Sequence, residues 1–180
     1  MTVTERTPEQ YRETIQRFLM AYWTRRKWEI EQTMLGVQIP IVALDVLYNS
    51  ALADQLAEIA RLAAGELSIE AAINLGVGES IQDLCERLFA APGAGTAYRI
   101  PAEFWTSPIG AIVAKAHFAL RGDEMITITE AAELLGISLS AVSNRIDRGT
   151  LQSFRDPDEP NPQRARRVLR SHVERLKGDQ

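Results

Sequence analysis

The chain carries the sequence TITEAAELLGIS at positions 127–138. Thr127 and Glu130 have the S/T-x-x-E spacing of a capping box, in which a hydroxyl and a carboxylate satisfy free amides at a helix start. Gly136 is placed to end that helix in a left-handed conformation, which glycine adopts without a steric penalty. Ser138 can then cap a second helix. The stretch therefore predicts two helices joined by a tight turn.

The second predicted helix, residues 139–148, has two different faces. Val142 and Ile146 lie on one side at helical spacing. The other side carries polar and basic residues, namely Ser140, Ser143, Asn144, Arg145 and Arg148. An apolar back with a front of Ser, Asn and Arg is typical of a helix that enters the major groove of DNA.

These two helices resemble the winged helix-turn-helix of the MerR and phage-excisionase type. Domains of that type begin with Thr-x-x-Glu-Ala-Ala and continue with Leu-Leu-Gly-Ile/Val-Ser. They close the second helix with an arginine–glycine–leucine step, which here reads Arg148-Gly149-Thr150-Leu151. The resemblance covers about residues 125–177. It implies DNA binding, and it implies that a wing and a final helix follow.

The residues after the second helix predict a short β-hairpin, the wing, and a last helix. Residues 152–155 alternate polar and apolar side chains as a strand does. Residues 156–162 contain three prolines and form a turn, and residues 164–170 can return as the second strand. Ser171 is placed to cap a helix over residues 171–177.

Positive charge is concentrated near the C-terminus. Residues 164–177 contain five arginines and one lysine against one acid, Glu174, in a chain whose formal net charge is −4. Such a local excess suggests an anionic partner. Strand alternation would place Arg164 and Arg166 on one side of the hairpin and Arg167 on the other.

The turn of the predicted wing is acidic, since it carries Asp156, Asp158 and Glu159. It is also longer and more acidic than in the excisionase pattern. Because carboxylates repel phosphate, we expect this turn to point away from DNA or to contact protein.

Side chains of the second helix and the wing are the predicted contacts to double-stranded DNA. They are Ser140, Ser143, Asn144, Arg145, Arg148, Arg164, Arg166 and Arg167. Arg145 and Asn144 are the candidates for base edges, because arginine pairs with guanine and asparagine with adenine. The other three helix residues would hold phosphates and set the register, and the wing arginines would add salt-sensitive backbone affinity. A lone domain of this size offers little contact, so we expect a homodimer on paired half-sites.

Two domains are predicted, a helical domain over residues 1–122 and the winged helix-turn-helix over residues 123–180. The junction between them is short, so we expect them to pack together. Within the first, residues 70–80 match residues 130–140 at six of eleven positions. A degenerate helix-turn-helix over residues 68–90 with a packing role is one interpretation, and chance similarity between two alanine-rich helix ends is the other.

Other helix signals occur in the first domain. Thr7 as a cap and Pro8 at the first helical position predict a long helix. Its aromatic-rich apolar stripe indicates a core element or, alternatively, a dimer surface. A second helix is predicted over residues 40–64, and Ser107 followed by Pro108 predicts a third.

Composition narrows the class of protein. Apolar residues make up 46% of the chain and charged residues 24%, which suits a packed core. Cys85 is the single cysteine, so an internal disulfide is excluded. Cys85, His117 and His172 are far apart in the sequence and do not have the spacing of metal ligands. No enzyme motif stands out, so we expect neither catalysis nor a cofactor. The lack of an export segment or membrane span predicts a cytoplasmic, nucleoid-associated protein.

These features together predict a mainly helical, sequence-selective DNA-binding protein that acts as a small transcriptional regulator. An antitoxin or a recombination accessory factor is an alternative within DNA binding. A protein-interaction adaptor would keep the helix-turn-helix shape and bury Arg145 against a protein partner. A sensor of a small-molecule effector would place its pocket among four aromatic residues, which are Trp23, Trp28, Phe104 and Trp105.

Overall fold

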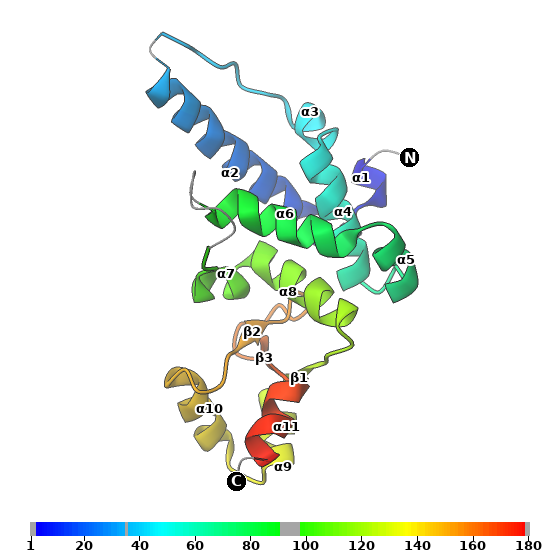
Figure 1. Cartoon of the computed structure of the whole chain (residues 1–180), viewed down its shortest axis with the longest axis vertical. Coiled ribbons are helices and arrows are strands. Elements are labelled where there is room, and N and C mark those ends of the chain that lie inside the picture. Colours follow the sequence, from blue (N-terminus) through cyan, green and yellow to red (C-terminus); the bar gives the residue numbers. More distant parts are fainter. Residues whose placement is uncertain (1–2, 35, 91–97, 179–180) are drawn as a thin grey trace.

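The computed structural model describes residues 3–34, 36–90 and 98–178. These ranges are mainly helical and include one small antiparallel sheet, which confirms the predicted fold class at that level. The long helix α2 (Glu9–Thr33) lies at one end of the molecule, and the last three helices lie at the other (Figure 1).

The described part of the chain before residue 121 contains helices as its regular elements. In addition to α2 they are α1 (Val3–Arg6), α3 (Leu44–Tyr48), α4 (Ala51–Ala63), α5 (Ile69–Asn74), α6 (Val77–Phe89), α7 (Ala102–Thr106) and α8 (Pro108–Leu120). The C-terminal part contains β1 (Met125–Thr127), α9 (Ile128–Leu135), α10 (Leu139–Asp147), β2 (Phe154–Arg155), β3 (Arg166–Leu169) and α11 (Arg170–Gly178). Within the described ranges, no helix is both long and apolar enough to cross a bilayer.

The start of α2 differs in detail from the prediction. Thr7 does not cap α2, because its hydroxyl donates to the carbonyl oxygen of Val3 at 2.9 Å and so completes α1. Pro8 occupies the N-cap position instead of the first helical position. The predicted helix is therefore confirmed, and the predicted cap is wrong.

The single helix predicted over residues 40–64 is divided into α3 and α4. Ser50 causes the division, since its side chain accepts a hydrogen bond from the amide of Ala53 at 3.2 Å and caps a new helix. By contrast, Ser107 caps α8 as predicted and accepts from the amide of Gly110 at 3.1 Å.

The last helix also begins differently from the prediction. Ser171 does not supply the capping group, since α11 already starts at Arg170. Asp123 does so instead, because its carboxylate accepts hydrogen bonds from both the amide and the hydroxyl of Ser171. The amide of Arg170 donates to the carbonyl oxygen of Glu124 at 2.9 Å, which ties the helix to the start of β1.

The interior consists of two main groups of buried side chains. The larger joins α1, α2, α4, α6 and α8. Ala53, Ala57 and Ala60 of α4 are fully buried, so that neighbouring helices approach closely. The smaller joins the C-terminal elements through Ile126, Ala131, Ala132, Leu135, Val142, Leu151, Val168 and Val173. Full burial of one large aliphatic side chain stabilises a fold by about 1.5–3 kcal/mol. Because several such side chains are buried together here, the smaller group forms a second hydrophobic core.

The sheet has the order β1-β3-β2 and is antiparallel throughout. Ile126 pairs with Val168, and Phe154 pairs with Arg167. Since β1 runs directly into α9, the central strand β3 fixes the hairpin against the first helix of the C-terminal pair.

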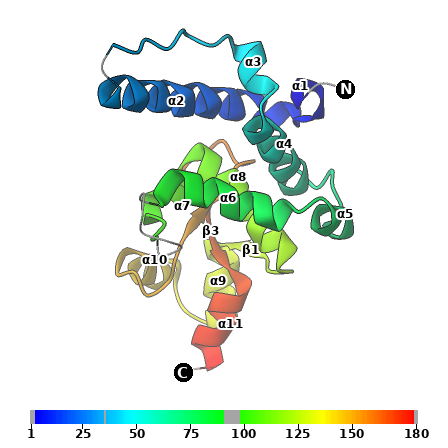
Figure 2. The same ribbon diagram turned by 45° about the horizontal axis from the view of Figure 1, so that its top comes forward.

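A third buried cluster joins the two parts of the chain, as the short junction predicts. It contains Ala114 of α8, Phe154 of β2 and Leu169 of β3. The ring of Phe154 lies edge-on to that of Phe118, with 4.8 Å between centroids, and 6.3 Å from that of Trp105. Figures 1 and 2 both show α8 between the N-terminal helices and the sheet.

Candidate nucleic-acid interface

The helix pair α9–α10 is held by the local interactions that its sequence predicts. The carboxylate of Glu130 accepts from the amide of Thr127 at 2.7 Å, and the Thr127 hydroxyl accepts from the amide of Glu130 at 3.1 Å. The bond from the Thr127 amide is the main reason that the pKa of Glu130 lies below its usual value. Gly136 ends α9 at φ +65°, and the Ser138 hydroxyl caps α10 by accepting from the amide of Ala141 at 3.2 Å.

Helix α10 presents one side to the small core and the other to solvent. Val142 is completely buried and Ile146 packs against the same core. The opposite side is a stripe of exposed residues at four-residue spacing, which are Ser140, Asn144 and Arg148. Ser143 and Arg145 flank this stripe and are half-buried. Of the two predicted base-reading residues, Asn144 is therefore the more exposed, and Arg145 must reach around the edge of the helix.

The chain leaves α10 through a fixed step. The carbonyl oxygen of Arg145 accepts from the hydroxyl and the amide of Thr150, each at 2.9 Å, and from the amide of Leu151 at 3.1 Å. Gly149 has φ +73°, a left-handed conformation that favours glycine. Leu151 is buried in the small core, so the step fixes where the hairpin begins relative to α10.

The hairpin arginines have three different positions. Arg164 is exposed but lies in the turn before β3, which corrects the predicted alternation of Arg164 and Arg166 along one strand. Arg166 is exposed, and its guanidinium lies 3.8 Å from a carboxylate oxygen of Asp147 on α10. Arg167 is half-buried, where it donates to Asp156 at 2.7 Å and to the backbone carbonyl of Arg164. Arg167 therefore holds the hairpin together, which makes it the predicted contact least available to an external partner.

The turn between β2 and β3, residues 156–165, hereafter the hairpin turn, contacts the helical part of the protein. Asp158 accepts a hydrogen bond from the buried hydroxyl of Tyr11 and another from the side-chain Nε2 of Gln10 at 3.2 Å. Asp158 also forms an ion pair with Lys115 of α8. The expectation that this acidic turn contacts protein is confirmed, and no signal in the local sequence identifies its partners.

The contacts of the hairpin turn predict that its docking on the helical part of the protein depends on pH. Burial opposes ionisation of Asp158, but Lys115 and Tyr11 outweigh it, so the pKa of Asp158 lies below its usual value. Burial first, and then Asp158, raise the pKa of Tyr11. A lowered carboxyl pKa contributes stability that is present above roughly pH 4 and is lost as the pH falls further. A raised tyrosine pKa contributes stability that is present below roughly pH 10 and is lost as the pH rises through the folded-state value.

We therefore expect the hairpin turn to stay docked between roughly pH 5 and pH 9 and to loosen outside that range. Hydrogen exchange of the Asp156 amide, which donates to the carbonyl of Ala165 at 2.7 Å, measures the opening after correction for intrinsic exchange. Asp158→Asn removes the titrating carboxylate and should abolish the acid limb while leaving slow exchange in α4 unchanged. Equal protection of Asp156 at pH 3 and pH 7 in the native chain would contradict this expectation.

The four aromatic residues considered for a sensor pocket do not share one. Trp23 and Trp28 line a hollow of 390 Å³ beside α2. Phe104 is buried in the large core, with its ring centroid 5.2 Å from that of Trp105. Trp105 borders a different groove, between α7 and the loop after α10. The predicted common pocket is therefore wrong, because α2 and α7 present these rings at different places.

Residues 70–80, which match part of residues 130–140 in sequence, run from α5 into α6. The connection between these two helices differs from the connection between α9 and α10. Gly76 is left-handed at φ +67° and stands directly before α6, which begins at Val77. Between Gly136 and the start of α10, by contrast, two residues intervene. Val77, Ile81 and Leu84 of α6 belong to the large core, which agrees with a packing role for this pair.

The remaining candidate groups have structural positions. Cys85 is buried, and burial raises the pKa of its thiol to about 11, so the thiolate is scarce at neutral pH. Burial lowers the pKa of His117. In the ranges that the structure describes, no cluster of His, Cys, Asp and Glu side chains could hold a metal ion.

Comparisons of the chain with protein-family models, curated proteins and solved structures gave no match. The resemblance to MerR and excisionase domains therefore stays a prediction from residues 125–177.

Proposed function

We propose that this protein binds DNA in a sequence-selective manner and acts as a small transcriptional regulator. Its DNA-binding domain would be a winged helix-turn-helix made of α9, α10 and the β2–β3 hairpin. The observation that carries the proposal is the exposed stripe of Ser140, Asn144 and Arg148 on a helix whose other side is fixed to a core. The major groove is about 12 Å wide and admits one helix with its side chains.

The proposed contacts follow from the positions of the side chains. Asn144 lies on the exposed side of α10 and can bond an adenine edge with both polar atoms of its side-chain amide. Arg145 has the length to reach a guanine from the flank of α10. Ser140 at the start of α10 and Arg148 at its end would hold phosphates on either side of the groove.

Arg166 is suited to exchange its ion pair with Asp147 of the same chain for a contact with a phosphate. Its pair with Asp147 joins two exposed side chains at 3.8 Å, and such surface pairs contribute only about 0–1 kcal/mol. Arg164 is exposed and lies in the turn just before β3. The hairpin turn is held on α2 and α8, so the wing would contact the backbone through these two arginines and not insert its tip into the minor groove.

Selection from a pool of random DNA duplexes, followed by sequencing across a salt series, tests the proposal. A homodimer should enrich a motif with two-fold symmetry. If three cations of each protomer contact phosphates, log K should fall against log salt with a slope of about −5. Absence of both enrichment and retention at low salt would reject DNA binding and favour the adaptor. An antitoxin or a recombination accessory factor would use the same interface and give the same result.

A further inference from the structure

We propose that two copies of this chain associate through the distal half of α2, residues 20–33, together with the extended segment 36–43 that follows it. The buried residues of α2 are Tyr11, Ile15 and Leu19, all in its first half. Its distal half is not buried in either core and projects at one end of the molecule (Figure 1). Isolated helices of this length are only marginally stable in water, so a partner surface would stabilise it.

Exposed apolar side chains are concentrated in this region. Among the described residues, nine large apolar side chains are exposed, and four of them fall between positions 28 and 41. These four are Trp28, Met34, Val37 and Ile41. Scattered single residues of this kind are ordinary on a protein surface, whereas a concentration of them indicates an interaction surface.

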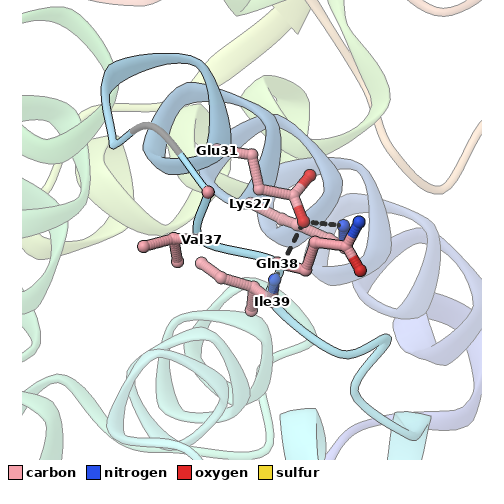
Figure 3. Close-up of a pocket in the computed structure, with 6 residues that line it drawn as sticks. Lys27, Glu31, Val37, Gln38 and Ile39 are labelled. Carbon is pink, nitrogen blue, oxygen red and sulfur yellow. Dashed lines mark hydrogen bonds and ion pairs between the residues drawn. The ribbon is translucent and has the colours of Figure 1, made fainter.

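The region also contains a preformed hollow of 390 Å³ lined by Met20, Trp23, Trp28 and Ile41. Ile41 is 83% exposed and Trp28 is 51% exposed. The carboxylate of Glu31 holds the extended segment beside the helix, since it accepts from the amide of Ile39 at 2.9 Å. Figure 3 shows this bond and the ion pair between Glu31 and Lys27.

The charges of the distal half of α2 are self-complementary about Trp28. Arg25, Arg26 and Lys27 precede it, and Glu29 and Glu31 follow it. If two copies of the helix cross antiparallel with a two-fold axis at Trp28, position 25 of one copy faces position 31 of the other, and position 27 faces position 29. Arg25 then faces Glu31 and Lys27 faces Glu29, while Arg26 turns inward and donates to the backbone carbonyl of Arg87. This charge match identifies the occupant of the surface as a second copy of the same chain.

Arg25, Trp28 and Glu31 are spaced by three residues and share one face of the helix, with Lys27 and Glu29 on its two flanks. The guanidinium of Arg25 stacks on the ring of Trp28 at 4.9 Å from its centroid, and Glu31 lines the same hollow as Trp28. Their present partners, Glu29 and Lys27, are on the same helix. The pair of Arg25 with Glu29 is largely exposed, and such pairs add little to stability, whereas the pair of Glu31 with Lys27 is half-buried. Exchange of the Arg25–Glu29 pair for a contact with the second copy therefore costs little stability.

The inference rests on the proposed function for its purpose, since a dimer offers two reading helices to paired half-sites. In Figure 1 the distal half of α2 and α10 lie at opposite ends of the molecule, so the association leaves α10 uncovered. Self-association is measurable in the absence of DNA. A dimer that fails to select DNA would thus reject the proposed function and leave this inference standing.

Sedimentation velocity of the full chain over a concentration series is the first test. Ile41→Ser should raise the dimer dissociation constant about tenfold or more, as removal of a central apolar side chain does. Ile73→Ser is the matched control, because Ile73 is also an exposed isoleucine but lies on α5, and it should leave the constant unchanged. A native chain that stays monomeric at roughly 100 µM, or equal constants for the two variants, would overturn the inference.

A charge-exchange experiment tests the antiparallel geometry. Arg25→Glu alone places two acids opposite each other, and Glu31→Arg alone places two cations opposite each other, so each variant should dimerise less than the native chain. Mixed together, they restore an acid facing a cation at both ends of the interface and should form a heterodimer. Because damage to folding would not be repaired by mixing, failure of the mixture to associate would reject this arrangement.

Discussion

Gly110→Ala is expected to lower the free energy of unfolding by about 3 kcal/mol or more, as severe overpacking does. A Cβ atom at this position would lie 1.7 Å from the carbonyl oxygen of Phe104 and 2.6 Å from its carbonyl carbon. These are backbone atoms, which cannot rotate out of the way as a flexible side chain can. Alanine would favour the helix by up to about 1 kcal/mol, so the clash decides the sign. Urea unfolding followed by circular dichroism measures the change.

Gly78→Ala is the matched control for that substitution. Gly78 also lies near the start of a helix, α6, but a Cβ there would meet no atom within 4 Å. This variant should be as stable as the native chain or more stable by up to about 1 kcal/mol. Equal stability of the two variants would show that α7 and α8 are not packed as closely as the structure has them.

The close approach at Gly110 also matters for the C-terminal elements. It sets α7 against α8, and α7 carries Trp105, whose ring lies beside Phe154 of β2. Separation of α7 from α8 would therefore disturb the cluster that joins the hairpin to the helical part. A small residue far from α10 thus helps to fix the position of the proposed DNA-reading elements.

Features that depend on neighbouring residues could be predicted from the sequence. The capping box of Thr127 and Glu130, the left-handed Gly136 and the Ser138 cap are each made within four residues of chain. Their chemistry is complete in the local sequence, so the structure places them as predicted. The exposed stripe of α10 follows for the same reason, since helical spacing alone determines which side chains share a face.

Features that depend on distant contacts could not be predicted. Asp158 meets Tyr11 and Lys115, which lie 147 and 43 residues away along the chain, and nothing in its neighbourhood indicates either. The role of Arg167 is hidden for a related reason. Three arginines in four residues indicate a basic surface, but only the folded hairpin shows that Asp156 binds this one. Charge patterns thus indicate a basic surface better than they indicate which of its arginines are exposed.

Arg145→Ala is expected to weaken binding to the selected DNA motif by about 1–3 kcal/mol and to relax the preference at one base position. The reason is the loss of a bidentate bond to a guanine edge. The substitution should leave non-specific binding nearly unchanged, because a base contact contributes little to it. Titration of the selected duplex and of a duplex with that base pair replaced measures both effects.

Arg166→Ala is the comparison variant for Arg145→Ala, because it removes a proposed phosphate contact instead of a proposed base contact. A phosphate contact carries no sequence information, so its removal should weaken binding to both duplexes alike. It should also make the salt slope shallower by about 1 for each phosphate that is no longer neutralised. Arg17→Ala, on an exposed part of α2, removes the same charge away from the interface and should change neither quantity. If Arg145→Ala behaves as Arg166→Ala does, with equal weakening on both duplexes, then Arg145 holds the backbone and base reading falls to Asn144.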